Sequence, residues 1–167
     1  GVELWMLDIA SDTATRLTDA TVNANLGNPV NWYRDSKALL VRLLPEKRNN
    51  LIDGKKSLPA GPIISVSDGS KAQNRTYQDM LKNPSDEENF VTLTTSELVK
   101  VDLNGNKTGY KKADMYAGET FSPDGNFVLI SVIHKPFSYI VPLNRFPQTT
   151  AVFDLDGKLI KTVEETP

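Results

Sequence analysis

The sequence predicts an all-β fold built from repeated antiparallel hairpins, and three observations lead to this prediction. Strand-like segments that end in an apolar-Asp-apolar pattern occur three times along the chain. Two strand-turn-strand segments with an aromatic residue before the turn alternate with them. Three of the five turns carry Asn-Gly or Asp-Gly, the strongest short-range hairpin signals.

The first kind of hairpin is a strand that ends in apolar-Asp-apolar, followed by a tight turn and a second strand. It covers residues 3–19, 97–111 and 150–162. Asn104-Gly105 and Asp156-Gly157 supply the positive φ that two-residue hairpin turns require. We therefore read these segments as the outer hairpins of a repeated unit.

The second kind of hairpin is a strand with an aromatic end, a turn and an apolar strand. It covers residues 30–41 and 118–130. Ser122-Pro123-Asp124-Gly125 is a strong turn signal, because proline presets φ and glycine accepts a left-handed conformation. These segments are the predicted inner hairpins.

An inner and an outer hairpin together form a four-stranded antiparallel sheet, and repetition of such sheets is typical of a β-propeller. The sequence thus predicts a partial β-propeller of about two and a half four-stranded antiparallel blades. Apolar runs at 39–44 and 127–133 suit strands that are buried on both faces between neighbouring blades. An ordinary β-sandwich is the alternative, and the recurrent aspartate register favours the propeller. The predicted units are an outer half-blade at 3–19, a blade at 28–112 and a blade at 113–166.

The blade at 28–112 carries a long insertion at about 45–95, and its second part predicts a short helix. Thr76 is the expected N-cap and Asn83-Pro84 the expected end, with Ser85 as the cap of a further turn. Its apolar face would hold Tyr77, Met80 and Leu81. Such an insertion serves either as a functional lid or as a packing cover, and the sequence leaves both open.

Composition excludes several classes of function. The 167 residues are 39% hydrophobic and 24% charged, as in a globular domain, and the net charge of −2 argues against nucleic-acid and membrane partners. No cysteine and one histidine predict no metal site, and we expect no cofactor. The chain begins at Gly1 directly before a strand pattern, so we expect it to be a fragment of a longer protein.

The sequence offers no catalytic constellation. The Gly-x-Ser-x-Gly elbow of an α/β-hydrolase is absent, and His134 stands alone at the end of a strand. The acidic segments 102–105 and 154–157 suggest calcium at first sight, but both fall where the repeat requires a turn. We therefore expect no catalytic residue in this chain.

The stretch from Ser131 to Pro147 is the most distinctive, because it is too apolar for a free loop and too rich in proline for a strand. Its residues 134–142 and 145–147, together with residues 1–5 and 75–82, resemble the propeller domain of the glutamyl endopeptidase branch of the prolyl oligopeptidase family. The resemblance covers essentially the whole chain, in the same order and with similar spacing. It implies a serine peptidase that cleaves after acidic residues, whose α/β-hydrolase domain and catalytic triad lie outside this chain.

In that family the propeller limits access to the active site, so the resemblance implies a non-catalytic gate. A substrate glutamate would need a cationic partner, for which Arg145, Lys135 and His134 are candidates, with Arg75 as a second choice. The alternative for Arg145 is that it pairs locally and fixes the loop.

The expected partners are a peptide substrate, the missing hydrolase domain and a further copy of the chain bound through open blade edges. A free-standing β-propeller that serves as a protein-interaction module is the alternative function, since fold alone does not separate the two.

Overall fold

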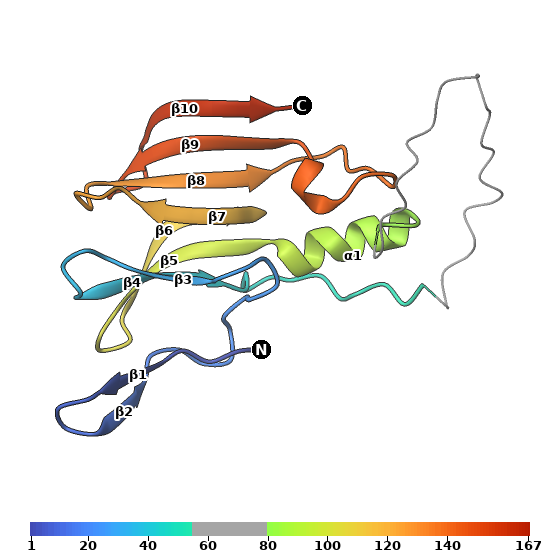
Figure 1. The fold of residues 1–167 in the computed structure, drawn as a ribbon. Coiled ribbons are helices and arrows are strands. Elements are labelled where there is room, and N and C mark those ends of the chain that lie inside the picture. Colours follow the sequence, from blue (N-terminus) through green and yellow to red (C-terminus); the bar gives the residue numbers. More distant parts are fainter. Residues whose placement is uncertain (55–79) are drawn as a thin grey trace, which may run out of the picture.

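A computed structural model describes residues 1–54 and 80–167, and this part of the chain is mostly β (Figure 1). One α-helix, α1 (Pro84–Thr94), and a short 3₁₀ turn, η1 (Leu143–Arg145), accompany the strands. The strands are β1 (Trp5–Asp8), β2 (Thr13–Arg16), β3 (Val30–Trp32), β4 (Ala38–Leu43), β5 (Ser96–Asp102), β6 (Lys107–Asp114), β7 (Tyr116–Phe121), β8 (Phe127–Ile133), β9 (Gln148–Asp154) and β10 (Leu159–Thr166).

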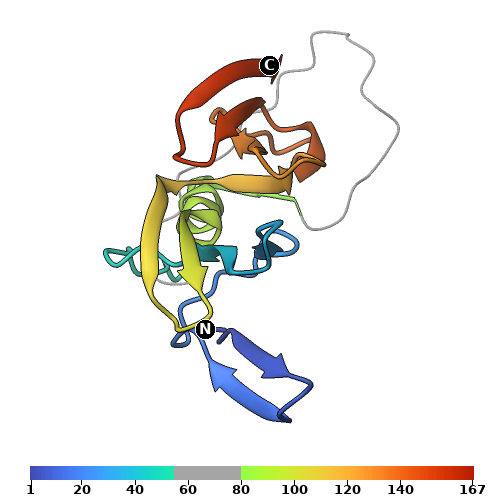
Figure 2. The ribbon, with the colours of Figure 1, turned by 90° about the vertical axis from the view of Figure 1, so that its left-hand side faces the viewer.

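The strands form three antiparallel β units, which follow one another in space in chain order (Figure 2). β1 and β2 make the N-terminal hairpin, β3-β4-β5-β6 the first sheet and β7-β8-β9-β10 the second sheet. Every predicted hairpin is therefore present with the expected antiparallel pairing. Within the described residues no sheet closes on itself, and the arrangement alone does not establish a propeller.

The two sheets repeat the same register. In the first sheet Ala38 of β4 lies opposite Asp102, and in the second Phe127 of β8 lies opposite Asp154. The Asp102 carboxylate accepts hydrogen bonds from the backbone N–H groups of the following turn at 2.8 and 2.9 Å, and Asp154 does the same at 3.0 and 2.8 Å. The repeated aspartate thus shapes a hairpin turn, as Asp side chains commonly do.

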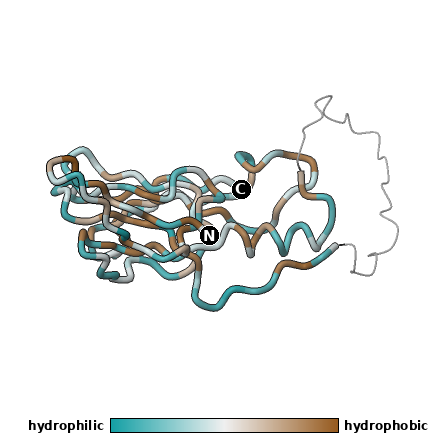
Figure 3. Tube along the Cα trace, turned by 90° about the horizontal axis from the view of Figure 1, so that it is seen from below, coloured by the Kyte–Doolittle hydropathy of each residue, from teal (hydrophilic) through white to brown (hydrophobic). Residues whose placement is uncertain are grey.

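Two hydrophobic clusters hold the β units together, and hydrophobic stretches run through the stacked strands (Figure 3). The first cluster lies between the N-terminal hairpin and the first sheet: Leu17, Val22, Leu39, Val41, Leu43, Val99 and Val101. The second lies between the two sheets: Tyr33, Ala38, Leu40, Leu98, Tyr116, Val128 and Ile130. β4 contributes to both clusters, because alternate residues of a strand point to opposite faces.

The predicted burial of β8 on both faces is only half right. Val128 and Ile130 are buried in the second cluster, whereas Phe127 and Leu129 on the other face are 38% and 39% exposed. The reason is that no described element covers the outer face of the second sheet. The prediction was right for β4, which has a neighbour on each side.

The helix lies later in the insertion than predicted. Thr76 and Tyr77 fall outside the described residues, and residues 80–83 are not helical. Asn83 begins the helix instead of ending one, because its side chain accepts a hydrogen bond from the Asp86 N–H at 2.9 Å. Pro84 follows at the first helical position, where its missing N–H is not needed. Ser85 lies inside the helix and is not its cap.

Candidate functional site

The proline-rich loop 134–147 packs on α1, at the end of the sheets opposite the β3–β4 and β7–β8 turns (Figure 1). Phe90 of α1 meets Phe137 and Phe146 of the loop with ring centroids 5.0 and 5.8 Å apart, and the two loop rings stack at 5.3 Å. Aromatic rings at these distances attract one another, so they hold the loop against the helix. The loop and the helix therefore form one unit, which we call the helix end of the molecule.

Polar contacts at the surface also join the loop to α1. The Lys135 ammonium lies 3.3 Å from a carboxylate oxygen of Glu87 and 3.1 Å from one of Glu88, and the Tyr139 hydroxyl donates to Glu87 at 3.0 Å. Hydrogen bonds to Glu88 and Glu87 raise the pKa of Lys135, so it stays charged. Its charge is already compensated, which leaves Lys135 poorly suited to bind a second carboxylate.

His134 is held by the neighbouring strand. Its ring Nε2 lies 2.9 Å from the hydroxyl of Thr149, and its backbone N–H donates to the carbonyl of Pro147 at 2.8 Å. No carboxylate orients the ring among the described residues. This geometry supports an anchor at the end of β8 better than a proton-transfer group.

Arg145 is the predicted cation that remains available. It ends η1 and is exposed, and its guanidinium has no hydrogen-bond or ion-pair partner within residues 1–54 and 80–167. Arg75, the second choice, lies outside the described residues. Of the four predicted site residues, the structure thus brings three to the helix end and leaves one with a free positive charge.

A pocket of about 660 Å³ is lined in part by Leu143 and Asn144, the two residues before Arg145. Its lining combines apolar side chains with carboxamides and holds no charged side chain: Asn25, Leu26, Gly27, Ala117, Ile133, Pro142, Leu143, Asn144 and Gln148. Amides offer both donors and acceptors, so such a lining matches an uncharged peptide main chain with an apolar side chain.

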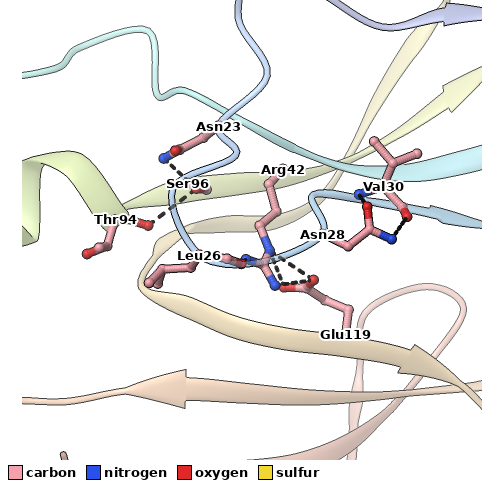
Figure 4. Close-up of polar contacts among 8 residues, drawn as sticks. All are labelled: Asn23, Leu26, Asn28, Val30, Arg42, Thr94, Ser96 and Glu119. Carbon is pink, nitrogen blue, oxygen red and sulfur yellow. Dashed lines mark hydrogen bonds and ion pairs between the residues drawn. The ribbon is translucent and has the colours of Figure 1, made fainter. Parts of the chain in front are cut away.

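A buried ion pair that contacts the pocket-lining residue Leu26 was not predicted. The Arg42 guanidinium of β4 donates hydrogen bonds to both carboxylate oxygens of Glu119 of β7 at 2.7 to 2.9 Å (Figure 4). It also donates a hydrogen bond to the carbonyl of Leu26. Arg42 and Glu119 are 2% and 7% exposed. Burial raises the pKa of Glu119, and its hydrogen bonds to Arg42 oppose that rise. The pair ties the first sheet to the second and positions the loop that lines the pocket.

Asn23 links this loop to the C-terminal end of α1. Its side-chain amide donates to the Ser96 hydroxyl at 3.0 Å (Figure 4). It also donates to the carbonyls of Leu93 and Thr95 at 2.9 and 3.1 Å. The last carbonyls of a helix lack partners inside it, so this amide stabilises the C-terminus of α1. The only sequence signal is an asparagine in an apolar setting, which is too common to mark a site.

No group of three or more acidic or histidine side chains in this part of the chain lies close enough to hold a metal ion. The described helix is also too short and too polar to cross a membrane.

Comparison with known proteins finds two similar plant proteins that share one name. The chain is 34% identical to "Probable glutamyl endopeptidase, chloroplastic" of Oryza sativa subsp. japonica over 170 aligned residues, which cover 99% of this chain and 18% of that protein. It is 32% identical to the protein of the same name from Arabidopsis thaliana, over 98% of this chain and 17% of that protein. The chain thus spans less than a fifth of the length of the curated relatives it matches.

No protein-family model matches the chain. No solved structure matches it either.

Proposed function

We propose that this chain is a non-catalytic part of a serine peptidase that resembles the glutamyl endopeptidases, and that it limits access of peptides to a catalytic domain elsewhere in the full-length protein. One observation carries the proposal: the similarity to two proteins of that name runs over nearly the whole chain but covers only 17–18% of their length. Such coverage leaves room for a catalytic domain outside this chain.

The two four-stranded sheets are, in this proposal, successive blades of a β-propeller of the prolyl oligopeptidase type. Their identical strand order, their common register at Asp102 and Asp154, and their face-to-face packing support it. The N-terminal hairpin then corresponds to the outer half of a preceding blade, since it packs on the first sheet through Leu4 and Met6.

The helix end is the part of the gate that we propose touches the peptide. Arg145 offers an uncompensated guanidinium, and the neighbouring pocket of about 660 Å³ offers carboxamides and apolar groups. An acidic side chain of the substrate would pair with Arg145 while the adjoining residue occupies the pocket. Lys135 and His134 hold the loop in place and do not contact the substrate.

The test is a specificity measurement on the full-length protein. Arg145→Gln should lower kcat/KM for peptides with glutamate before the cleaved bond at least tenfold, and leave peptides with glutamine there unchanged. Arg34→Gln, at the opposite end of the sheets, is the matched control and should change neither. Equal loss on both substrates, or no loss on either, would refute the role of Arg145.

The gating role and the peptidase class need a separate readout. The full-length sequence should carry Gly-x-Ser-x-Gly downstream, and the protein should cleave after glutamate in short peptides faster than in folded proteins. A full-length protein with no such motif and no hydrolase activity would instead favour the free-standing interaction module.

A further inference from the structure

A second pocket, of about 420 Å³, is lined by residues of both sheets at the end opposite the helix end (Figure 1). The β3–β4 turn contributes Arg34 and Asp35, the β7–β8 turn contributes Asp124, and β5 contributes Lys100. All these elements belong to β units that the structure describes, so the pocket walls do not depend on β units outside this chain. Two cations and two carboxylates thus line one pocket, and their charges sum to zero.

These four charged side chains do not pair with one another. No ion pair found in residues 1–54 and 80–167 includes any of them. Opposite charges that face one pocket without pairing leave electrostatic attraction available to a ligand that carries both signs.

Two of the four charged groups already have partners that shape the turns. Both carboxylate oxygens of Asp124 accept hydrogen bonds, from Ser122 and from Asn126. The Arg34 guanidinium donates to the carbonyl of Pro123. We assign these two side chains to the walls of the pocket and not to contact with a ligand.

The other two charged groups are open. The Asp35 carboxylate accepts one hydrogen bond, from the backbone N–H of Lys37 at 3.0 Å, and its second oxygen has no partner among the described residues. The Lys100 ammonium lies 4.7 Å from the centroid of the Tyr33 ring, and it has no carboxylate or carbonyl partner in the same part of the chain. One anion and one cation are therefore available in the same pocket.

Tyr33 adds an unused hydrogen-bond donor to the lining. It is 6% exposed, and its hydroxyl has no hydrogen-bond partner within residues 1–54 and 80–167. Burial, together with the nearby charge of Asp35, raises the pKa of Tyr33 to about 12, so the hydroxyl stays protonated at neutral pH. A buried hydroxyl without a partner costs free energy, which favours a ligand that brings an acceptor to this wall.

We propose that this pocket binds a small zwitterion with a free ammonium and a free carboxylate, as in an amino acid or a dipeptide. Its carboxylate pairs with Lys100 and its ammonium with Asp35. A ligand with a single charge would leave one of these groups unpaired, so the lining selects against it. A volume of about 420 Å³ lies within the range of about 300 to 1,000 Å³ that is common for small-molecule pockets. The inference does not require the peptidase function.

Three ligands of similar shape test the need for both charges. L-Leucine carries both, N-acetyl-L-leucine lacks the ammonium, and L-leucinamide lacks the carboxylate. Leucine is the probe because Leu155 gives the pocket an apolar side chain. In calorimetric titrations of the chain, leucine should bind with a Kd of about 1 mM, as suits so small a ligand. Each analogue should bind about tenfold more weakly, the effect of losing a hydrogen bond to a charged group. Equal affinity for all three, or no saturable binding of leucine, would refute the proposal.

Two substitutions assign the charges. Lys100→Gln should weaken leucine binding about tenfold and leave leucinamide unaffected, because leucinamide has no carboxylate to lose a partner. Asp35→Asn should weaken leucine binding to a similar extent and leave N-acetyl-leucine unaffected, and its amide oxygen can still accept from the Lys37 N–H. Circular dichroism and the denaturation midpoint establish that each variant is folded. A variant that weakened all three ligands alike would overturn this assignment.

Lys161→Gln is the matched control. Lys161 is exposed on β10 and lies outside the pocket lining, so this variant should bind leucine like the unmodified chain. A loss of binding as large as that of Lys100→Gln would show that net charge, and not the pocket, determines affinity.

Leucyl-leucine distinguishes the two sources of such a ligand. It carries the same two charges as leucine, but farther apart. Tighter binding of the dipeptide than of leucine would assign the pocket to short peptides, and weaker binding would assign it to free amino acids.

Discussion

β4 and β8 occupy the same place in their sheets, but their environments differ. β4 is buried along its whole length, whereas exposed and buried residues alternate at the start of β8. Both strands are rich in branched apolar residues, so their composition does not cause the difference. The first sheet lies between two β units, and the second sheet has a described neighbour on one side only. Burial of a strand in this chain therefore depends on how many neighbouring sheets it has.

The comparison extends to a pair of polar positions. Arg42 of β4 corresponds in register to Ser131 of β8. Arg42 points at the second sheet and finds Glu119 there, whereas Ser131 shares a hydrogen bond of 2.8 Å with Thr150 inside its own sheet. At this position, the long charged side chain occurs in the sheet whose neighbour supplies a partner of opposite charge.

The largest predicted effect comes from breaking this buried pair. Glu119→Leu leaves the Arg42 charge buried without a carboxylate, which should reduce the free energy of unfolding by about 3 to 5 kcal/mol. Arg42→Met combined with Glu119→Leu should regain most of that loss, because no buried charge remains. Urea denaturation measures both.

Ser131→Ala is the control for this prediction and should cost about 0.5 to 1.5 kcal/mol, the usual value for one hydrogen bond. If Glu119→Leu lowered the free energy of unfolding as little as Ser131→Ala does, the buried ion pair would contribute no more than one ordinary hydrogen bond.

The second prediction compares two equivalent leucines. Leu40→Ala should cost about 2 to 5 kcal/mol, because it opens a cavity between the two sheets. Leu129→Ala should cost about 1 kcal/mol or less, since its side chain already contacts solvent. Denaturation curves at low protein concentration give both values. Equal losses would mean that the outer face of the second sheet is covered in solution.

The hairpins and turns were predictable from the sequence because their signals are local. Asn104-Gly105 and Asp156-Gly157 shape turns in which both glycines have positive φ, at 83° and 81°. The repeated aspartate could be recognised from the sequence because its carboxylate accepts hydrogen bonds only from the next few residues. The fold class was therefore predictable as antiparallel β, while the closed arrangement of a propeller depends on contacts beyond a single hairpin.

The contacts of the candidate site were not predictable, because they join distant parts of the chain. Arg42 and Glu119 are 77 residues apart, and Lys135 and Glu88 are 47 apart. Lys135 was a candidate for the substrate carboxylate because the sequence gives no sign that α1 lies beside it. The misplaced helix had a different cause: Asn-Pro is compatible with the end of one helix and with the start of another.

The third prediction concerns equivalent turns. Ser36 in the β3–β4 turn and Gly125 in the β7–β8 turn both have positive φ, at 56° and 73°. Gly125→Ala should cost about 1 to 2 kcal/mol for the left-handed backbone, and more because its Cβ would lie 2.6 Å from the Cβ of Arg34. Ser36→Gly should be neutral or slightly stabilising, because glycine adopts this conformation without strain. Thermal unfolding of both variants is the measurement, and a destabilised Ser36→Gly would contradict the expected strain at Ser36.

The smallest predicted effect is a difference in titration between the same two turns. The Ser122 hydroxyl donates to Asp124 at 2.5 Å, and together with the N–H groups of Asn126 it lowers the pKa of Asp124 to about 2. In the β3–β4 turn the place of Ser122 is taken by Tyr33, whose buried hydroxyl has no partner among the described residues.

Because the pKa of Asp124 in the folded chain lies below its ordinary value of 3.8, its carboxylate stabilises the fold above that pH. This contribution disappears as the pH falls from about 4 through about 2. Ser122→Ala should shift the pKa of Asp124 upward toward 3.8 in an NMR titration of the side-chain carboxyl carbons. Ser131→Ala removes a hydroxyl that bonds no carboxylate and should leave this titration unchanged. If the pKa of Asp124 did not change in Ser122→Ala, the N–H groups of the turn, and not the Ser122 hydroxyl, would cause its low pKa.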